Sequence, residues 1–241
     1  MRKQEDKYSE SLLECEKPWI FIMMIAVGGF LGAYTYTLKG KVFCNAQTAN
    51  FVMLAVQIGR LNFQKAAYYF VPITAYLLGA VLSEFLPRRV NNLAVLRWDT
   101  ALVAFEIICL FIIGLVPDSA PPQICQVTIN FIASMQYNTF RQAKKIPMAT
   151  TFCTNHLRQV GVHLVKWIHK KDPVARNRML MHIGMITAFV AGGIAATILG
   201  VYFKGRAIWG AEILLLIVFA DLLRADLGYE KNKLNMVPHG H

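Results

Sequence analysis

Two clusters of polar side chains interrupt an otherwise apolar sequence, and their residue types could bind a small solute. The first cluster precedes the apolar stretch 51–58 and consists of Asn45, Gln47, Thr48 and Asn50. Thr48 or Asn50 could cap a short helix, and the free N–H groups at such a helix terminus attract anions and carbonyl oxygens. We therefore expect a site for an anionic or carbonyl-rich solute. The alternative is that these groups only close a loop and cap a helix.

The second cluster repeats the same residue types later in the chain. Its members are Thr150, Thr151, Thr154, Asn155, His156 and Arg158. Arg158 is the most informative, because an arginine in an apolar segment is costly to insert unless it faces a cavity, a counter-charge or a ligand. Snorkelling of Arg158 towards the cytoplasmic interface is the alternative. For His156 the alternative is a hydrogen-bonded position in the core.

Two carboxylates, Glu106 and Glu212, stand inside apolar runs, at the same offset in each half of the chain. This pattern is typical of proton carriers, cation ligands or partners of Arg158. The alternative is a pair of protonated or hydrogen-bonded carboxyls that join helices. The sequence contains no nucleotide-binding, metalloprotease or serine-nucleophile signature, and its cysteines lack metal-type spacing. We therefore expect no catalysis, no cofactor and no metal site.

The elements that must position these residues are helices in a lipid bilayer. Of the 241 residues, 56% are hydrophobic and only 16% are charged, against roughly 25% charged residues in soluble domains. The apolar residues form six runs long enough to cross ~30 Å of hydrocarbon. These runs are Trp19–Leu38, Ala66–Leu86, Trp98–Val116, Pro122–Phe140, Met179–Phe203 and Ala207–Leu223. Two shorter stretches, Phe43–Gly59 and Met148–Ile168, are too polar for comfortable spans.

The distribution of lysines and arginines decides whether the two short stretches are predicted to span the membrane or to enter and leave it on the same side. If both cross the membrane, the basic residues divide almost evenly between the two sides, whereas if both dip in and return, most lie on the amino-terminal side. The positive-inside rule favours the second arrangement. The prediction is an all-α integral membrane protein with six spanning helices, two short re-entrant half-helices and both termini in the cytoplasm. The net charge of +11 is spread between the apolar runs, so nucleic-acid binding is not expected.

The chain also shows an internal duplication. One shift of the sequence against itself aligns the apolar runs and superposes Thr48 on Thr154 and Glu106 on Glu212, as internal repeats of transporters do. With three spans in each half, the halves must run in opposite directions, which makes them inverted-topology repeats. The segments are a cytoplasmic tail at 1–17, a first repeat at 18–117, a second repeat at 118–228 and a cytoplasmic tail at 229–241.

Several motifs resemble one family of membrane proteins. They read Gly29-Phe30-Leu31-Gly32-Ala33, Val42 to Asn50, Ser134-Met135-Gln136-Tyr137-Asn138 and Thr150 to Asn155. The sequence resembles the YoaK family of bacterial membrane proteins, also called domain of unknown function 1275, over most of its length. The resemblance implies the plasma (inner) membrane of a bacterium as the location. It also adds Gln136 and Asn138 to the candidate solute-binding residues. Gly32 stands where the family pattern has an aspartate.

These features lead to two functional hypotheses. The first is a small-solute transporter or channel with its site between the amino termini of the two half-helices. The alternative is a membrane scaffold or sensor that transports nothing and holds a partner or anionic lipid through basic cytoplasmic loops. Rows of small residues at helical spacing predict helix packing or a homodimer. They are Ala75, Gly79 and Ser83, and Gly192, Ala196 and Gly200.

Overall fold

The computed structural model describes residues 12–91, 95–144, 146–236 and 238, and most of them are helical. The α-helices are α2 (Pro18–Leu38), α3 (Gln47–Gly59), α4 (Phe63–Asn91), α5 (Trp98–Leu115), α6 (Pro122–Thr139), α7 (Thr154–Lys170), α8 (Pro173–Phe203) and α9 (Trp209–Leu227). Short 3-10 helices are η1 (Glu14–Glu16), η2 (Lys204–Ile208) and η3 (Lys231–Lys233). Strands β1 (Gln142–Ala143) and β2 (Ile146–Pro147) form a small antiparallel hairpin. Apart from this hairpin the described chain is all-α, as predicted.

Four stretches of the described chain are long and apolar enough to cross a membrane. They are Pro18–Leu38, Phe63–Asn91, Trp98–Leu115 and Pro173–Leu227, the last containing both α8 and α9. Their outer faces expose large apolar side chains, including Leu77 at 61% and Phe85 at 67% of their surface. Such a surface suits hydrocarbon rather than water. The protein is therefore a helical membrane protein.

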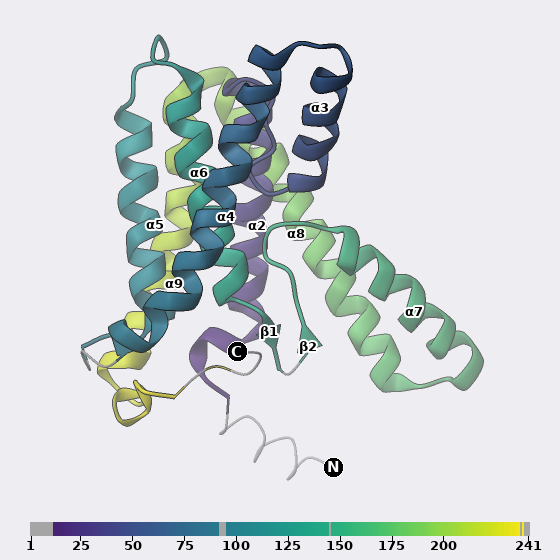
Figure 1. The fold of residues 1–241 in the computed structure, drawn as a ribbon. Coiled ribbons are helices and arrows are strands. Elements are labelled where there is room, and N and C mark those ends of the chain that lie inside the picture. The colour runs from purple at the N-terminus through teal and green to yellow at the C-terminus, as the bar shows by residue number, and fades with distance from the viewer. Residues whose placement is uncertain (1–11, 92–94, 145, 237, 239–241) are drawn as a thin grey trace.

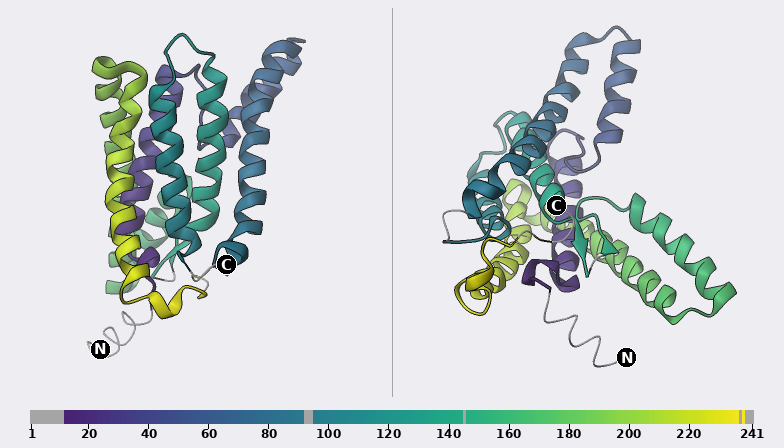
Figure 2. Two further views of the ribbon diagram at one scale, coloured as in Figure 1. Left: turned by 90° about the vertical axis from the view of Figure 1, so that its left-hand side faces the viewer. Right: turned by 60° about the horizontal axis from the view of Figure 1, so that its bottom comes forward.

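The helices pack in matching pairs. Helix α2 packs most extensively against α8, and α4 against α6, while α5 lies along α9. Helix α3 packs on α4, and α7 packs on α8. Figure 2 shows these last two pairs as arms that diverge from the bundle.

Small residues allow the close packing of these pairs. A Cβ atom on Gly29 of α2 would lie 2.0 Å from the carbonyl oxygen of Phe189, and one on Gly192 of α8 would lie 1.9 Å from that of Ala26. The other predicted small-residue row faces α6, where a Cβ on Gly79 would lie 2.3 Å from the Phe131 carbonyl oxygen. Both rows therefore pack helices within one chain.

The two ends of the bundle carry different loops. The described amino- and carboxyl-terminal segments lie at the same end as the β1–β2 hairpin (Figure 1). At the opposite end, Lys39 pairs with Asp118 at 3.3 Å, and the Tyr34 hydroxyl donates to the Gly205 carbonyl at 2.8 Å. The chain therefore passes from one end to the other along α2, α4, α5, α6, α8 and α9 in turn (Figures 1 and 2).

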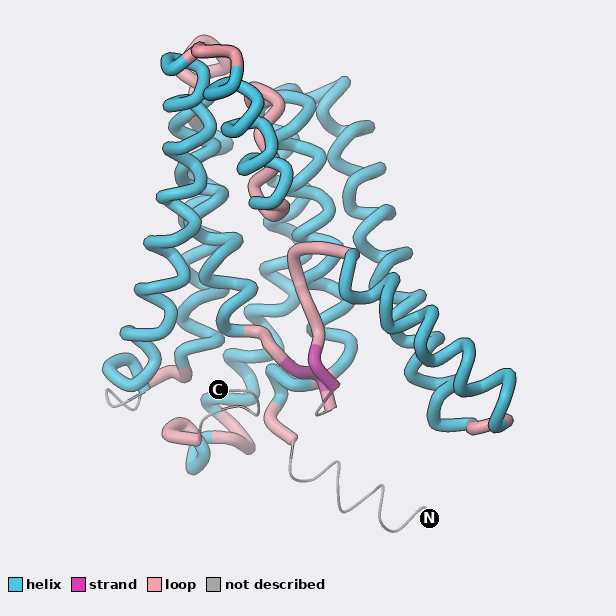
Figure 3. Tube along the Cα trace, turned by 45° about the vertical axis from the view of Figure 1, so that its right-hand side comes forward, coloured by secondary structure: helices cyan, strands magenta, loops and turns pink. Residues whose placement is uncertain are grey.

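Helices α3 and α7 do not run the length of the bundle. Both begin about halfway along it, after loops that reach inward, and they run towards opposite ends (Figures 1 and 3). Helix α7 also points away from the bundle axis, together with the first turns of α8 (Figure 3). Their amino termini therefore lie at an intermediate level of the bundle.

Candidate functional site

The loops that precede α3 and α7 meet on one glycine of α2. The side-chain Nδ2 of Asn45, in the first loop, donates to the Gly28 carbonyl oxygen at 2.9 Å. From the second loop, the Thr150 carbonyl oxygen lies only 2.4 Å from the place where a Cβ on Gly28 would stand. Gly32, one turn further along α2, leaves space for the Asn45 side chain, because a Cβ atom on Gly32 would lie 2.8 Å from Nδ2 of Asn45. The glycines of α2 thus let both loops enter the bundle.

Three buried hydroxyl groups have unused hydrogen-bonding capacity, two of them in the second inward loop and one on α6. Ser134, Thr150 and Thr151 are all buried, and their hydroxyl oxygens have no hydrogen-bond partner among the described residues. A buried hydroxyl without a partner is costly. These groups are therefore available to a bound solute or to water. Gln136, on the same helix as Ser134, donates from Nε2 to the Met24 carbonyl of α2 at 3.1 Å.

A chain of side-chain amides ties α3 to α6. Gln47 donates to Oδ1 of Asn130 at 2.7 Å, and Asn50 donates to Oε1 of Gln47 at 3.1 Å. Asn130 then donates to the Gln126 carbonyl at 2.7 Å. We call Gln47, Asn50, Gln126 and Asn130 the amide chain. Gln126 continues it to the Lys39 carbonyl at 2.6 Å and to the hydroxyl of Tyr68.

The expectation that Thr48 or Asn50 caps the first half-helix is wrong. The residue at the N-cap position is Ala46, so Thr48 and Asn50 both lie inside the first turn. Asn50 instead clamps the preceding loop, accepting from the Phe43 N–H at 3.3 Å and donating to the Phe43 carbonyl at 2.7 Å. Thr48 is exposed. Helix α7 likewise follows Cys153, which forms no side-chain cap.

Arg158 and Thr154 point away from the packed interior of the described chain. Both residues are exposed, and Arg158 donates to Oδ1 of Asn155 at 3.0 Å. In the described chain this guanidinium thus bonds a neutral amide rather than a carboxylate. This placement agrees with the alternative in which the long Arg158 side chain extends towards the interface.

A polar cavity lies beside the second inward loop. Its volume is about 240 Å³, and it is lined by Tyr137, Asn138, Arg141, Pro147, Met148, Ala149, Phe152 and Asn155. We call it the Asn138 cavity. Asn138 donates to the Ser83 hydroxyl at 2.9 Å, and Arg141 pairs with Glu84 at 2.8 Å. The Asn138 cavity brings together two predicted site residues, Asn138 and Asn155.

The remaining predicted residues occupy separate places. His156 is fully buried, and its Nε2 bonds the Ala149 carbonyl at 2.8 Å, which fixes the loop that carries Thr150. Glu106 is buried in the middle of α5. Glu212 lies in the first turn of α9 and lines a different, largely apolar cavity of about 430 Å³ together with Trp209.

Comparison with protein families gives a match over residues 20–220, to a model described as protein of unknown function, DUF1275. The chain belongs to this family. The DUF1275 match includes both inward loops, the amide chain and the Asn138 cavity. No curated protein and no solved structure matches the chain.

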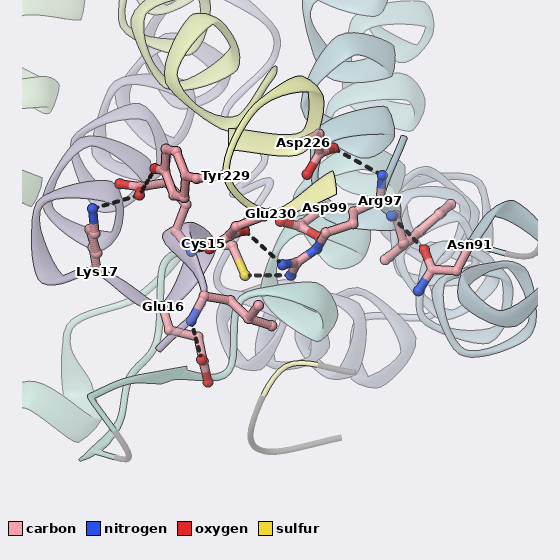
Figure 4. A network of polar contacts seen from close by, with 12 residues as sticks. Cys15, Glu16, Lys17, Asn91, Arg97, Asp99, Asp226, Tyr229 and Glu230 are labelled. Atoms are coloured by element: carbon pink, nitrogen blue, oxygen red, sulfur yellow. Dashed lines mark hydrogen bonds and ion pairs between the residues drawn. The ribbon is translucent and has the colours of Figure 1, made fainter. Parts of the chain in front are cut away.

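A second polar cluster, which the sequence analysis did not predict, joins the described terminal segments of this DUF1275 chain (Figure 4). Its centre is Arg97, with 1% of its surface exposed. The guanidinium donates to Asp99 at 3.0 Å, to Glu230 at 3.1 Å and to the Cys15 sulfur at 3.0 Å. The Arg97 N–H donates to Asp226 at 3.0 Å. We call these residues the terminal clasp.

The terminal clasp joins segments that are far apart in the sequence. The Glu14 N–H donates to Glu230 at 2.8 Å, and the Tyr229 hydroxyl donates to the Glu14 carboxylate. Burial raises the pKa of the Cys15 thiol well above its usual range. Burial also raises the pKa of Glu230, although the nearby Arg97 lowers it in part. The only local sequence signal was the pair Arg97 and Asp99 beside an apolar run.

Proposed function

We propose that this protein is a transporter or channel for a small anionic or carbonyl-rich solute. The observation that carries the proposal is the meeting of the two inward loops on Gly28, through Asn45 and the Thr150 carbonyl. A loop can lie at membrane depth only where protein groups or a water-filled cavity provide hydrogen bonds for its backbone N–H and C=O groups. The buried, unpartnered hydroxyls of Thr150 and Thr151 supply hydrogen-bonding groups at the same loop.

The proposed architecture has two inverted repeats, each with three spanning helices and one half-helix. Under this scheme α2, α3, α4 and α5 correspond to α6, α7, α8 and α9. The packing supports it, because α2 against α8 then corresponds to α6 against α4, and α3 on α4 corresponds to α7 on α8. Half-helices that run in opposite directions fit the same scheme (Figure 1). Transporters with such repeats bind their solute at the repeat interface, near helix termini.

The proposed solute class follows from the chemistry of the Asn138 cavity. Amides from Asn138 and Asn155 and the guanidinium of Arg141 line it, and these groups donate hydrogen bonds to carboxylate and carbonyl oxygens. We place the entrance from the cytoplasm here, because the positive-inside rule assigns this end of the bundle to the cytoplasm of a bacterium. Glu106 and Glu212 are proposed as coupling groups, each of which must be neutral or partnered inside the membrane.

The test uses purified protein and reconstituted vesicles. A solute that binds only the folded protein raises its melting temperature, so a panel of small carboxylates, inorganic anions, amides and amino acids is screened by thermal unfolding. Each hit is then tested for flux into vesicles. The double variant Thr150→Val, Thr151→Val removes two hydroxyls at nearly constant shape and should abolish both stabilisation and flux.

The control for this test is Thr197→Val. Thr197 is exposed on α8, and its hydroxyl bonds only the Gly193 carbonyl of its own helix, at 2.9 Å. This variant should keep both responses. A panel with no stabilising solute and no flux, in protein that unfolds cooperatively, contradicts the transport proposal.

A second candidate function has its own structural support. The arm formed by α7 and the first turns of α8 exposes basic side chains beside apolar ones such as Leu157 and Ile168. The basic residues are Arg158, Lys166, Lys170, Lys171, Arg176 and Arg178. Such an amphipathic surface suits a membrane interface with anionic headgroups. A scaffold of this kind would be stabilised by vesicles of anionic lipid and unaffected by every small solute, which distinguishes it from a transporter.

A further inference from the structure

Three buried histidines form a cluster between α7 and α8. His156 and His163 come from α7, His182 comes from α8, and their exposed surfaces are 0%, 6% and 0%. Nδ1 of His156 lies 2.9 Å from Nδ1 of His182. The rings of His163 and His182 are nearly parallel, at 8°, with centroids 6.1 Å apart. We call these residues the histidine triad.

The hydrogen bonds determine which nitrogens carry protons. The Ala149 carbonyl can only accept, so Nε2 of His156 must carry a proton to make its 2.8 Å bond. In a neutral ring Nδ1 of His156 is then an acceptor, and its 2.9 Å partner, Nδ1 of His182, must be the donor. A neutral His182 therefore has an unprotonated Nε2. This assignment leaves one basic lone pair pointing into the protein interior.

That lone pair has nothing to bind within the described part of the chain. Nε2 of His182 and Nδ1 of His163 are both buried without a hydrogen-bond partner there. The charged groups that act on His182 from α7 and α8 are Arg158 and Arg178, both positive. Lys166, Arg178 and Asp172 act on His163, but Asp172 already accepts from the Val174 N–H at 2.8 Å as the cap of α8. Helix α2, which packs on α8, has its only ionisable residues, Tyr34 and Tyr36, near its far end.

We propose that the histidine triad is a proton-binding site that holds α7 on α8 while neutral and releases α7 when His182 takes up a proton. A hydronium ion in the surrounding water loses the proton, which forms an N–H bond at Nε2 of His182, and a water molecule is left behind. The resulting imidazolium is buried, and the charged groups of the described α7 and α8 that act on it, Arg158 and Arg178, repel it, so the packed arrangement loses stability relative to one in which water reaches the ring. Helix α8 is the main packing partner of α7, so the release is confined to this arm.

The triad also connects to the proposed solute site. His156 holds the Ala149 carbonyl, and the next two residues, Thr150 and Thr151, carry the unpartnered hydroxyls. Release of α7 would free this loop, so proton uptake would change solute binding. Only this last link rests on the proposed transport function. Proton binding and release of α7 are measured without any solute.

The first experiment is nitrogen NMR of protein labelled with ¹⁵N-histidine in lipid nanodiscs, which requires no variant for the main result. At neutral pH we expect His156 protonated at Nε2 and His182 protonated at Nδ1. Because burial and the neighbouring positive groups disfavour the charged ring, His182 should gain its second proton below about pH 6.5, the ordinary value of a histidine, and the titration is followed down to about pH 4. Protonation of neutral His182 at Nε2 instead of Nδ1, or all three rings remaining neutral at about pH 4, overturns the proposal.

The second experiment measures amide hydrogen exchange of residues 154–170 over the same pH range, corrected for the intrinsic pH dependence. Opening linked to one proton changes by about tenfold per pH unit, so protection of α7 should fall with that slope on acidification. His182→Gln should remove the slope, and His169→Gln, on an exposed histidine of the same helix, should keep it. Unchanged protection of α7 in the wild type contradicts the proposal. Release of α7 without any solute flux would support this site and contradict only the transport function.

Discussion

The side-chain amide of Asn45 lies 2.9 Å from the carbonyl oxygen of Gly28, on the same residue against which the Thr150 carbonyl packs. This contact joins the two inward loops through a single turn of α2. A side chain at position 28 would therefore disturb both loops together.

The first prediction concerns Gly28→Ala. The added Cβ would lie 2.4 Å from the Thr150 carbonyl oxygen, so the backbone must shift, at a cost of about 1–3 kcal/mol. The matched control is Gly161→Ala in α7, where nothing lies within 4 Å of a Cβ and alanine should add about 0.5–1 kcal/mol of helix stability. Thermal unfolding in detergent measures both. Equal melting temperatures for the two variants would show that the loops do not meet at Gly28.

The second prediction concerns the bond between Gln47 and Asn130. A double-mutant cycle with Gln47→Met and Asn130→Leu should give a coupling of about 0.6 kcal/mol and no more than about 1.7 kcal/mol, the range measured between membrane helices. The control cycle pairs Gln47→Met with Thr197→Val, which does not belong to the amide chain, and should give a coupling near zero. Additive effects in both cycles would argue against the amide chain.

The third prediction concerns the terminal clasp. Arg97→Leu leaves Asp99 and Glu230 buried without their cation, and breaking a buried ion pair from one side costs about 3–5 kcal/mol. Arg89→Leu, at an exposed position at the same end of the bundle, should change stability by about 0.5 kcal/mol or less. Denaturant unfolding compares the two variants. A similar small loss in both would mean that the clasp contributes little to stability.

The fourth prediction concerns the pH dependence of stability. Burial raises the pKa of Glu14, but hydrogen bonds with Lys17, Tyr229 and Asp221 outweigh it and leave the pKa below its ordinary value of 4.5. The stabilisation from Glu14 is therefore complete above pH 4.5 and is lost as the pH falls through the lowered pKa. Glu14→Gln should show a smaller loss of melting temperature on acidification than the wild type.

Glu230→Gln provides a control of opposite sign. Burial raises the pKa of Glu230 above 4.5, so its contribution to stability decreases as the pH rises from 4.5 through the raised pKa. The difference in melting temperature between wild type and Glu230→Gln should therefore decrease over that window. If Glu14→Gln and Glu230→Gln respond to pH in the same way, the lowered pKa of Glu14 and the raised pKa of Glu230 cannot both be correct.

The fifth prediction concerns orientation in the membrane. Lys171 and Lys204 are both exposed lysines at the C-cap positions of α7 and α8, with positive φ angles of 50° and 49°, so cysteine replacements at the two sites are well matched. In a background without the native cysteines, a membrane-impermeant thiol reagent should label position 204 from outside the cell and position 171 only after the cell is opened. Labelling of both positions from the same side is incompatible with the proposed topology.

The helices could be predicted well from the sequence, because apolar runs report directly on burial in lipid. The run Trp19–Leu38 became α2, Pro18–Leu38, and Pro122–Phe140 became α6, Pro122–Thr139. Helix α8 begins six residues before its apolar run, at Pro173, because its basic first turns pack against α7 rather than entering the bundle. Hydropathy alone does not detect the first turns of a helix that are stabilised in this way.

The polar contacts were less predictable, because their partners come from distant parts of the chain. Gln47 was predicted as a site residue, but its bond to Asn130 depends on how α3 folds back. Arg97 was not singled out, since Cys15 and Glu230 lie far from it in the sequence. For the same reason His182 had no visible connection to His156 before the α7–α8 arm was known.

The separation of Gln47 from Asn130 also has a consequence for biosynthesis. The two residues are 83 positions apart, so a ribosome adding about 5–20 residues per second makes Asn130 roughly 4–17 s after Gln47. During that interval the side-chain amides of Gln47 and Asn50 have no partner on α6. Exposing these amides to hydrocarbon without hydrogen bonds would be costly. The segment before α3 should therefore remain in water or within the insertion machinery until α6 is delivered, and settle between the helices only afterwards.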